Sequence, residues 1–348
     1  MVATPAAAPP PGPVAGPDRV SAQMLLGNPS GATEASSNRD NYLIRRPQYA
    51  LAYSDSLRFP RWVSWHLSAA DIGDVERGQF QPDPDLPPGF AKVVPSDYTG
   101  SGYDRGHNCP SKDRSATRAD NDAVFYMTDI TPQLHAMNGG PWERLESYCR
   151  DLTEQGNELY ISCGHGFDGG PRAKPSRLLG RNRVAVPDFG WKVVVVLPAR
   201  PGDDRARIDA RTRVIAVRMP NAEGIASDDW RGYRVPVSEI EKATGLTFFD
   251  ALPAEVARAL KTRVDTEGGS GGASLTSGGS RRRSGPGAAP APGGGPGKVW
   301  VNTRSGVYWR PGTEYYGKTS RGEYMTESEA QKAGFRAAQD PSGGNRRR

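Results

Sequence analysis

The sequence predicts an α+β protein in which a largely antiparallel sheet is flanked by helices. One observation is a set of clustered β-rich runs, each bounded by Gly, Pro or Asp. A second is that amphipathic helical segments lie scattered between and after these runs, which favours segregated helices over a repeating βαβ pattern. A third is a Gly/Ser/Pro-rich stretch at 267–297 that has too few apolar residues to bury a core.

Composition divides the 348 residues into five parts. A flexible Pro/Ala-rich leader is expected at 1–20 and a main domain at 21–266. The disordered linker at 267–297 then leads to a small accessory module at 298–339 and a basic tail at 340–348. Nearly all of the apolar periodicity falls in the main domain, so the core and any active site are expected there.

The elements of the main domain follow from local patterns. Apolar runs rich in β-branched and aromatic residues predict strands at 60–68, 123–130, 158–164, 191–199 and 212–220. Helices are expected at 141–156, 237–245 and 253–264. In the first of these helices, Pro141 suits the first helical position and Gly156 suits the stop. Leu145, Cys149 and Leu152 form its apolar stripe.

Charge and cysteine content limit the classes of function. The formal net charge is +6 and the pI is about 9.2, which favours an anionic partner. Three cysteines allow one disulfide or three free thiols. No apolar run is long enough for a transmembrane helix, so no membrane insertion is expected. The N-terminal residues lack the basic and apolar regions of an intact signal peptide.

The segment "SGYDRGH" at 101–107 holds one of only four histidines in the chain. Gly and Pro break up its surroundings, so we expect a loop there rather than a buried strand. A predicted strand and the helix at 141–156 follow. A strand, a histidine loop, a strand and a helix can fold as a ββα unit, which would place His107 opposite Asn138 and Glu146.

A row of residues spaced by four runs into this helix, namely Asn138, Trp142, Glu146 and Arg150. Each step of four turns the helix by about 400°, so the row stays near one side. The alternative is a solvated face with a Glu146–Arg150 ion pair, which would contribute only a few tenths of a kcal/mol.

These residue types together could hydrolyse a phosphodiester. His107 could take a proton from water, and Arg105 and Arg150 could bind phosphate oxygens. Asn138 could hold a hydrated Mg²⁺ or Mn²⁺ by one oxygen, because such ions keep most of their waters. Glu146 could accept hydrogen bonds from those waters.

The chain resembles the DNA/RNA non-specific endonucleases that carry a ββα-metal finger and a DRGH motif. The resemblance covers essentially the whole main domain. It is carried by "MLLGNPSGAT" (24–33), "TGSGYDRGH" (99–107), "MTDITPQ" (127–133) and the Asn-to-Glu row. It implies a metal-dependent endonuclease that acts on DNA and RNA and leaves 5′-phosphorylated oligonucleotides. It also implies an extracellular or periplasmic protein, as a monomer or homodimer.

The resemblance implies a role for each matching residue. His107 resembles the general base, and Asn138 resembles the sole direct protein ligand of Mg²⁺ or Mn²⁺. Glu146 resembles the acid that fixes metal-bound water. The substrate-binding arginines that contact the phosphate would be Arg77, Arg105 and Arg150.

Two aspartates accompany these residues. Asp104 resembles the residue that orients the finger. Asp129 stands where family members commonly have Asn, which adds a negative charge near the expected site.

Two other classes of function compete with the nuclease. A zinc site could use the two His-x-Cys or Cys-x-His pairs, although zinc ligands are usually two to four residues apart; the four residues are His107, Cys109, Cys163 and His165. A non-catalytic nucleic-acid-binding protein could instead use the basic linker and the aromatic C-terminal module. His66 and His135 are expected to be structural.

Overall fold

The structure is a computed structural model, and the residues it describes are 17–267, 297–302, 307–311, 316 and 323–337. The chain divides into two compact units, Met1–Ala273 and Ser274–Arg348. The predicted linker and tail, and residues 1–16 of the predicted leader, lie almost entirely outside the described residues. Helix α1 (Pro17–Ala22) begins within the range assigned to the leader.

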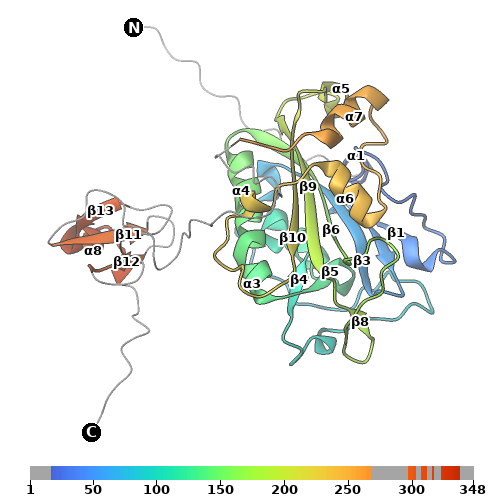
Figure 1. Cartoon of the computed structure of the whole chain (residues 1–348), viewed down its shortest axis with the longest axis horizontal. Helices are drawn as coiled ribbons and strands as arrows, with labels where there is room; N and C mark the ends of the chain where they lie inside the picture. The colour runs from blue at the N-terminus through green and yellow to red at the C-terminus, as the bar shows by residue number, and fades with distance from the viewer. Residues whose placement is uncertain (1–16, 268–296, 303–306, 312–315, 317–322, 338–348) are drawn as a thin grey trace. The chain divides into compact units, whose positions relative to one another are not determined.

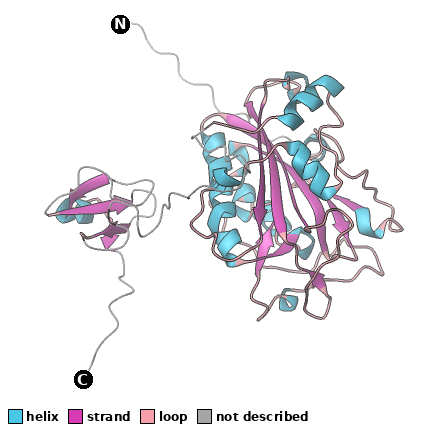
Figure 2. Cartoon of the chain, viewed as in Figure 1, coloured by secondary structure: helices cyan, strands magenta, loops and turns pink. Residues whose placement is uncertain are grey.

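The main unit is built on an antiparallel six-stranded sheet of order β1-β2-β3-β6-β9-β10 (Figure 2). Its strands are β1 (Tyr42–Arg45), β2 (Ala50–Ser54), β3 (Phe59–Leu67), β6 (Asn157–Gly166), β9 (Phe189–Pro198) and β10 (Arg213–Pro220). The long central strands β6 and β9 pair along their whole lengths. The α+β class and the strands predicted at 60–68, 158–164, 191–199 and 212–220 are therefore confirmed.

The strand predicted at 123–130 is wrong. Helix α2 (Arg118–Ala123) ends there, and the turn η5 (Met127–Asp129) and strand β5 (Ile130–Gln133) follow. The side chain of Thr117 accepts a hydrogen bond from the Asp120 backbone N–H and starts α2. Phe125 and Met127 are buried all the same. Apolar content alone does not distinguish a buried turn from a buried strand.

The loop predicted around His107 is also wrong. Residues Asp104–His107 form strand β4, which pairs antiparallel with β5 in a separate two-stranded sheet. The pairing needs glycine at 106, because a Cβ there would lie 2.3 Å from the side chain of Gln133. The first strand of the ββα unit is thus the DRGH segment itself.

The helix predicted at 141–156 begins in an irregular way. Helix α3 (His135–Met137) runs into a π turn, η6 (Asn138–Trp142), and only then into helix α4 (Glu143–Glu154). Pro141 lies inside the π turn rather than at the first helical position. The predicted stop is present, since Gly156 adopts φ +85° just after the helix.

The other helices of this unit are short. Helices α6 (Val237–Thr244) and α7 (Ala254–Thr262) confirm two predictions, and α5 (Asp204–Arg207) follows β9. Single turns complete the connections: η1 (Arg39–Asn41), η2 (Ala69–Asp71), η3 (Pro95–Asp97), η4 (Ser111–Arg114) and η7 (Trp230–Tyr233). A small hairpin of β7 (Leu178–Leu179) and β8 (Val184–Ala185) precedes β9.

The sheet is covered by helices on both faces (Figure 1). Leu145, Cys149 and Leu152 of α4 pack with Val194 and Trp65 on one face. On the other face, α6 and α7 supply a second cluster of apolar residues, Val237, Ile240, Ala257 and Leu260. The apolar stripe predicted for α4 is therefore confirmed. The α4 face also holds Cys109, Phe125 and Met137, which places the β4–β5–α4 unit there.

The second unit has a small sheet of its own, of order β13-β11-β12-β14. Its elements are β11 (Lys298–Asn302), β12 (Val307–Trp309), β13 (Glu323–Thr326), α8 (Glu327–Lys332) and β14 (Arg336–Ala337). Val299, Val301, Tyr308 and Ala330 form its core. No helix among the described residues of either unit is both long enough and apolar enough to cross a membrane.

Candidate active site

Strand β4 holds His107 against two aromatic rings. The imidazole centroid lies 5.2 Å from the ring of Phe80 and 4.8 Å from the ring of Phe125, and the two rings lie 5.0 Å from each other. The Nε2 atom is buried, and none of the described residues forms a hydrogen bond to it. No carboxylate forms an ion pair with the ring, so nothing favours the imidazolium form.

The pKa of His107 is lowered to about 3, first by burial and then by the nearby charge of Arg77. An imidazole with such a pKa is neutral throughout the physiological range. It is therefore in the unprotonated form from which a general base must start, and a pKa nearer the working pH is what makes such a base effective.

Two arginine side chains lie close to the same two phenylalanine rings. The guanidinium of Arg77 lies 5.5 Å from the centroid of Phe125, and that of Arg105 lies 5.5 Å from the centroid of Phe80. Arg105 is fixed further, because its Nε and Nη2 donate to the Pro95 carbonyl at 3.1 and 2.9 Å. His107, Arg77 and Arg105 are thus brought together.

Asp104 orients Asn138. The Asn138 Nδ2 group donates to Asp104 Oδ2 at 2.9 Å, and the same oxygen is 2.8 Å from His135 Nδ1. Because a carboxylate only accepts hydrogen bonds, the amide nitrogen of Asn138 must face it, and the amide oxygen faces away. The supporting role expected for Asp104 thus has a physical basis, and His135 shares the same carboxylate oxygen.

The amide oxygen of Asn138 suits a divalent metal ion. Mg²⁺ and Mn²⁺ prefer hard oxygen ligands and keep several waters. The amide oxygen of Asn138, with the Asp104 carboxylate nearby, is therefore a suitable environment for either ion. The π turn places Asn138 where the chain cannot be a regular helix, since Gly140 within it has φ −103° and ψ −123°. Such turns interrupt helices mostly at functional positions.

Glu146 does not form the solvent-exposed pair with Arg150. Its Oε1 is 3.2 Å from the ammonium of Lys192, a β9 side chain that is 1% exposed. The Lys192 ammonium also lies 4.3 Å from the Trp142 ring centroid and 5.6 Å from that of Trp65. The alternative of a solvated ion-paired helix face is therefore wrong, because α4 turns this side toward the sheet.

The pKa values of Glu146 and Lys192 are both raised, but for different reasons. Burial raises the pKa of Glu146, although Lys192 and Arg150 oppose the shift. Burial acts to lower the pKa of Lys192, but the Glu146 carboxylate outweighs it and the pKa is raised. Lys192 therefore keeps its charge and supports the ionised form of Glu146.

Arg150 is buried at the next turn of α4. Its Nη1 donates to Asp113 Oδ1 at 3.0 Å, and its Nη2 lies 3.9 Å from Glu143 Oε1. The other oxygen of Asp113 accepts a hydrogen bond from the Trp65 indole at 3.1 Å. Arg150 thus lies with Glu146 and Lys192, whereas His107, Arg77 and Arg105 form the other part of the site around Phe80 and Phe125.

Asp129 is completely buried between these two parts. Its Oδ1 accepts a hydrogen bond from the Cys109 backbone N–H at 3.1 Å, and its Oδ2 has no partner among the described residues. Burial, with Glu146 nearby, raises its pKa well above the usual range. Its surroundings therefore oppose the extra negative charge expected at this position.

Several site residues were not predicted. Phe80 and Phe125 lack any local signature, and Asp113 lies in the turn η4 just after the DRGH segment without a pattern that marks it. The sequence does contain a signal for Lys192. This lysine interrupts the apolar run "WKVVVV", and a charged residue in a buried strand must be paired. His165 is also buried, and its Nε2 lies 2.9 Å from Gln133 Nε2.

The zinc alternative is not supported. Among the described residues, one set of His, Cys, Asp and Glu has its ligand atoms within 4.8 Å of one another, and it is His66, Glu158 and Asp204. Cys109 and Cys163 are instead buried free thiols, as is Cys149, which leaves no disulfide among them.

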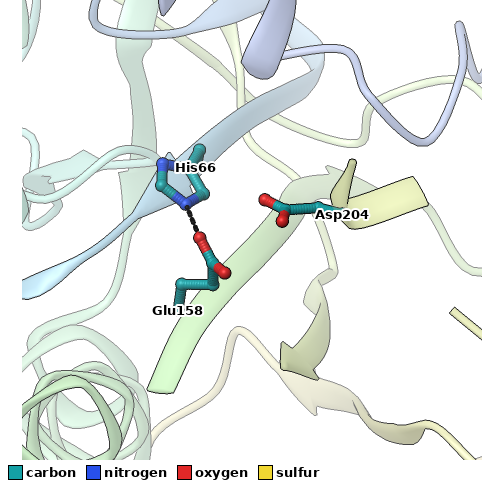
Figure 3. Close-up of side chains that lie close together, drawn as sticks. All are labelled: His66, Glu158 and Asp204. Carbon is teal, nitrogen blue, oxygen red and sulfur yellow. Dashed lines mark hydrogen bonds and ion pairs between the residues drawn. The ribbon is translucent and has the colours of Figure 1, made fainter. Parts of the chain in front are cut away.

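The His66 cluster is an ion-pair network on another part of the sheet (Figure 3). His66 Nε2 lies 3.0 Å from Glu158 Oε2, and Arg207 pairs with both Glu158 and Asp204. A cation would have to compete with this guanidinium for both carboxylates. The ring of His66 also packs on Tyr160, which belongs to the core on the face opposite α4.

A family model described as DNA/RNA non-specific endonuclease matches residues 26–255. The chain belongs to the DNA/RNA non-specific endonuclease family. A curated "Nuclease" from Nostoc sp. (strain PCC 7120 / SAG 25.82 / UTEX 2576) is 44% identical over 247 residues, which cover 71% of this chain and 87% of that protein. The α+β fold with its ββα unit is that of an endonuclease of this family.

More distant relatives carry the same domain. Human "Endonuclease G, mitochondrial" is 32% identical over 65% of this chain and 74% of its own length. Zebrafish "Nuclease EXOG, mitochondrial" is 34% identical, and the match spans 60% of that protein. A solved structure described as the EndoG/EndoGI complex matches with a TM-score of 0.57 and 28% identity, covering 69% of this chain and 95% of that one.

Proposed function

We propose that this endonuclease hydrolyses phosphodiester bonds in both DNA and RNA, depends on Mg²⁺ or Mn²⁺, and leaves 5′-phosphates. The observation that carries the proposal is a neutral histidine held beside two arginines. His107 has its pKa lowered to about 3, while Arg77 and Arg105 lie against the same two phenylalanine rings and Arg105 is held by hydrogen bonds to the Pro95 carbonyl. A proton acceptor next to fixed guanidinium groups is what attack of water on a phosphodiester requires.

Each of the basic residues of the candidate site has a defined task in this proposal. His107 takes the proton of the attacking water. Arg77 and Arg105 bind phosphate oxygens and stabilise the negative charge that develops on them, and Arg150 adds a third positive charge. None of these steps needs contact with a base or with the 2′ position of the sugar, so the proposal covers both DNA and RNA.

The metal would be held at the other end of β4. Asn138 would bind it through the amide oxygen that Asp104 turns outward, and Glu146 would accept hydrogen bonds from its waters. Lys192 would keep that carboxylate ionised. When bound, Mg²⁺ or Mn²⁺ supplies Lewis-acid stabilisation of the phosphate and of the leaving oxygen.

The test is cleavage of plasmid DNA and of structured RNA by the purified chain with Mg²⁺, with Mn²⁺ and with EDTA. Both polymers should be cut internally with either ion and left intact in EDTA. The products should be ligatable without prior phosphorylation, which reports 5′-phosphate ends. Binding without cleavage under every condition would favour the non-catalytic alternative. Fractionation of producing cells would test the proposed extracellular or periplasmic location.

A further inference from the structure

The segment before β9 carries five basic residues and no acidic one between 171 and 183: Arg172, Lys174, Arg177, Arg181 and Arg183. All five are exposed. Within the described part of the chain, none of them has a carboxylate at ion-pair distance. At the other end of β9, Arg207, Arg211 and Arg213 each pair with an acid, while Arg200, Arg205 and Arg258 are exposed there.

The tip of this hairpin is fixed to the loop beside the site. The Asn182 side chain donates to Asp97 Oδ2 at 2.8 Å and to the Lys92 carbonyl at 3.0 Å. Gly180 lies so close to Asp97 that a Cβ on it would be 2.5 Å from the Asp97 Cα. Arg181 and Arg183 flank Asn182 directly, so their backbone positions are fixed as well.

The same loop holds an arginine of the site. Asp97 closes the turn η3, which begins at Pro95, and the Pro95 carbonyl accepts two of the hydrogen bonds that Arg105 donates. Arg177 provides a second link, since it donates to the Ser101 carbonyl at 3.3 Å and lies 5.1 Å from the Tyr103 ring centroid. The hairpin and β4 are thus tied together through residues 95–103.

A cluster of apolar side chains connects the β7–β8 hairpin to the site. Leu179 and Val184 pack with Met127 and Ile130 around β5, and Phe80, which contacts His107, packs against this cluster. Lys192 and Glu146 also lie near the beginning of β9, which is the end that the hairpin precedes. In Figure 1, β4, β5 and β8 accordingly lie toward one end of the main unit and α5 and α7 toward the other.

We propose that the β7–β8 hairpin and Lys92 form a docking surface for the sugar-phosphate backbone of the substrate beyond the scissile bond. The inference rests on the proposed function. Unpaired cations on a hairpin whose backbone is fixed to the loop that holds Arg105 can contact successive phosphates without reading bases, which suits a non-specific nuclease. Leu178, 36% exposed among these cations, offers an apolar contact for a sugar.

The test compares two triple variants of the full chain with equal change of charge. One is Lys92→Gln/Arg181→Gln/Arg183→Gln. The control is Arg200→Gln/Arg205→Gln/Arg258→Gln, whose side chains are exposed near α5 and α7 at the other end of the sheet. Binding of a fluorescent long duplex is measured by anisotropy in EDTA between about 50 and 200 mM salt. Cleavage of the duplex and of a dinucleotide is measured with Mg²⁺.

The hairpin variant should bind the duplex roughly tenfold more weakly at low salt, and its slope of log K against log salt should be smaller by about two to three. Its KM for the duplex should rise by a similar factor, while the dinucleotide, which is too short to reach the hairpin, loses far less. The control should match the unmodified chain in all of these measurements.

Three results would overturn the docking surface. One is an unchanged salt slope, another is an equal effect of the control variant, and the third is an equal loss on dinucleotide and duplex. A chain that binds through the hairpin but never cuts would instead contradict the proposed function and leave the surface standing.

Discussion

At the scale of single residues, the chemistry depends on which groups are kept neutral and which are kept charged. His107 is uncharged because burial against two aromatic rings disfavours the imidazolium and the charge of Arg77 opposes protonation. Lys192 is charged because the Glu146 carboxylate pairs with it and outweighs the effect of burial. Both states are set by neighbours that are distant in sequence, and each can be tested by substitution.

We expect His107→Ala to lower the rate of cleavage by ~10²–10⁴-fold, because it removes the general base. The β4 backbone pairing does not involve the side chain, so circular dichroism and the melting temperature should change little. Turnover like that of the unmodified enzyme in a folded variant would show that another group takes the proton.

The two glutamates of α4 provide a matched pair. Glu146→Gln should sharply reduce cleavage and raise the Mg²⁺ concentration needed for half-maximal rate, because the carboxylate that faces Lys192 is lost. Glu143→Gln should leave turnover nearly intact, since its side chain is 44% exposed and its only contact with the site is at 3.9 Å from Arg150. Rates measured across a Mg²⁺ titration decide the matter. A Glu143→Gln variant that is the more impaired of the two would mean that the metal lies on a different side of the helix.

Asp129 predicts a pH dependence of stability. Burial raises its pKa in the folded state above the unfolded value, so folding takes up a proton as the pH rises above about 4. The stability that this group contributes is complete below the unfolded pKa and is lost as the pH rises toward the folded pKa. Asp129→Asn should therefore flatten the fall in unfolding free energy as the pH rises above the unfolded pKa of about 4. Urea titrations at several pH values measure this, with the exposed Asp74→Asn as control.

At the scale of elements, the π turn between α3 and α4 determines where Asn138 lies. Gly140 brings this turn close to the backbone of Ala226. A Cβ on Gly140 would be 3.0 Å from the Cα of Ala226. Backbone cannot move aside as a flexible side chain can, so the turn itself must shift.

Gly140→Ala should therefore cost about 1 kcal/mol of stability and raise the Mg²⁺ requirement by displacing Asn138. Gly232→Ala is the matched control, because a Cβ there would meet nothing within 4 Å. Equal Mg²⁺ dependence of both variants and the unmodified enzyme would show that the turn tolerates the methyl group and that the position of Asn138 does not depend on it.

At the scale of the whole molecule, the chain separates into a nuclease unit and a small C-terminal unit. The end of the first unit is held by ion pairs, since Asp265 pairs with Arg213 and Arg234, and Glu267 also pairs with Arg213. The natural place to cut is thus after Ala273, where the two units divide, rather than directly after Asp265.

Truncation after Ala273 should leave a folded and active nuclease, because every site residue lies in the first unit. Cleavage of a short duplex should be unchanged within about twofold, while retention on long polymers should weaken if the second unit adds a contact. An unfolded or inactive truncation would show that the second unit completes the domain or its site.

The sequence by itself determined the long regular elements and the residue types of the site. Strands β3, β6, β9 and β10 were predictable because alternating or continuous apolar runs of that length have few other stable arrangements. The spacing from His107 to Asn138, Glu146 and Arg150 was predictable because the resemblance spans the whole domain. Local patterns failed where a short segment is stabilised only by its partner, as in β4, whose pairing with β5 cannot be seen from "DRGH" alone.

Tertiary structure alone decided the electrostatic state of the site. Phe80 and Phe125 come from separate segments, and their convergence on His107 contributes to the burial that lowers its pKa. Lys192 reaches Glu146 from strand β9, and complete burial raises the pKa of Asp129. A pKa depends on the dielectric and charge within a few ångströms of the group, and those surroundings are assembled by packing between elements far apart in the chain.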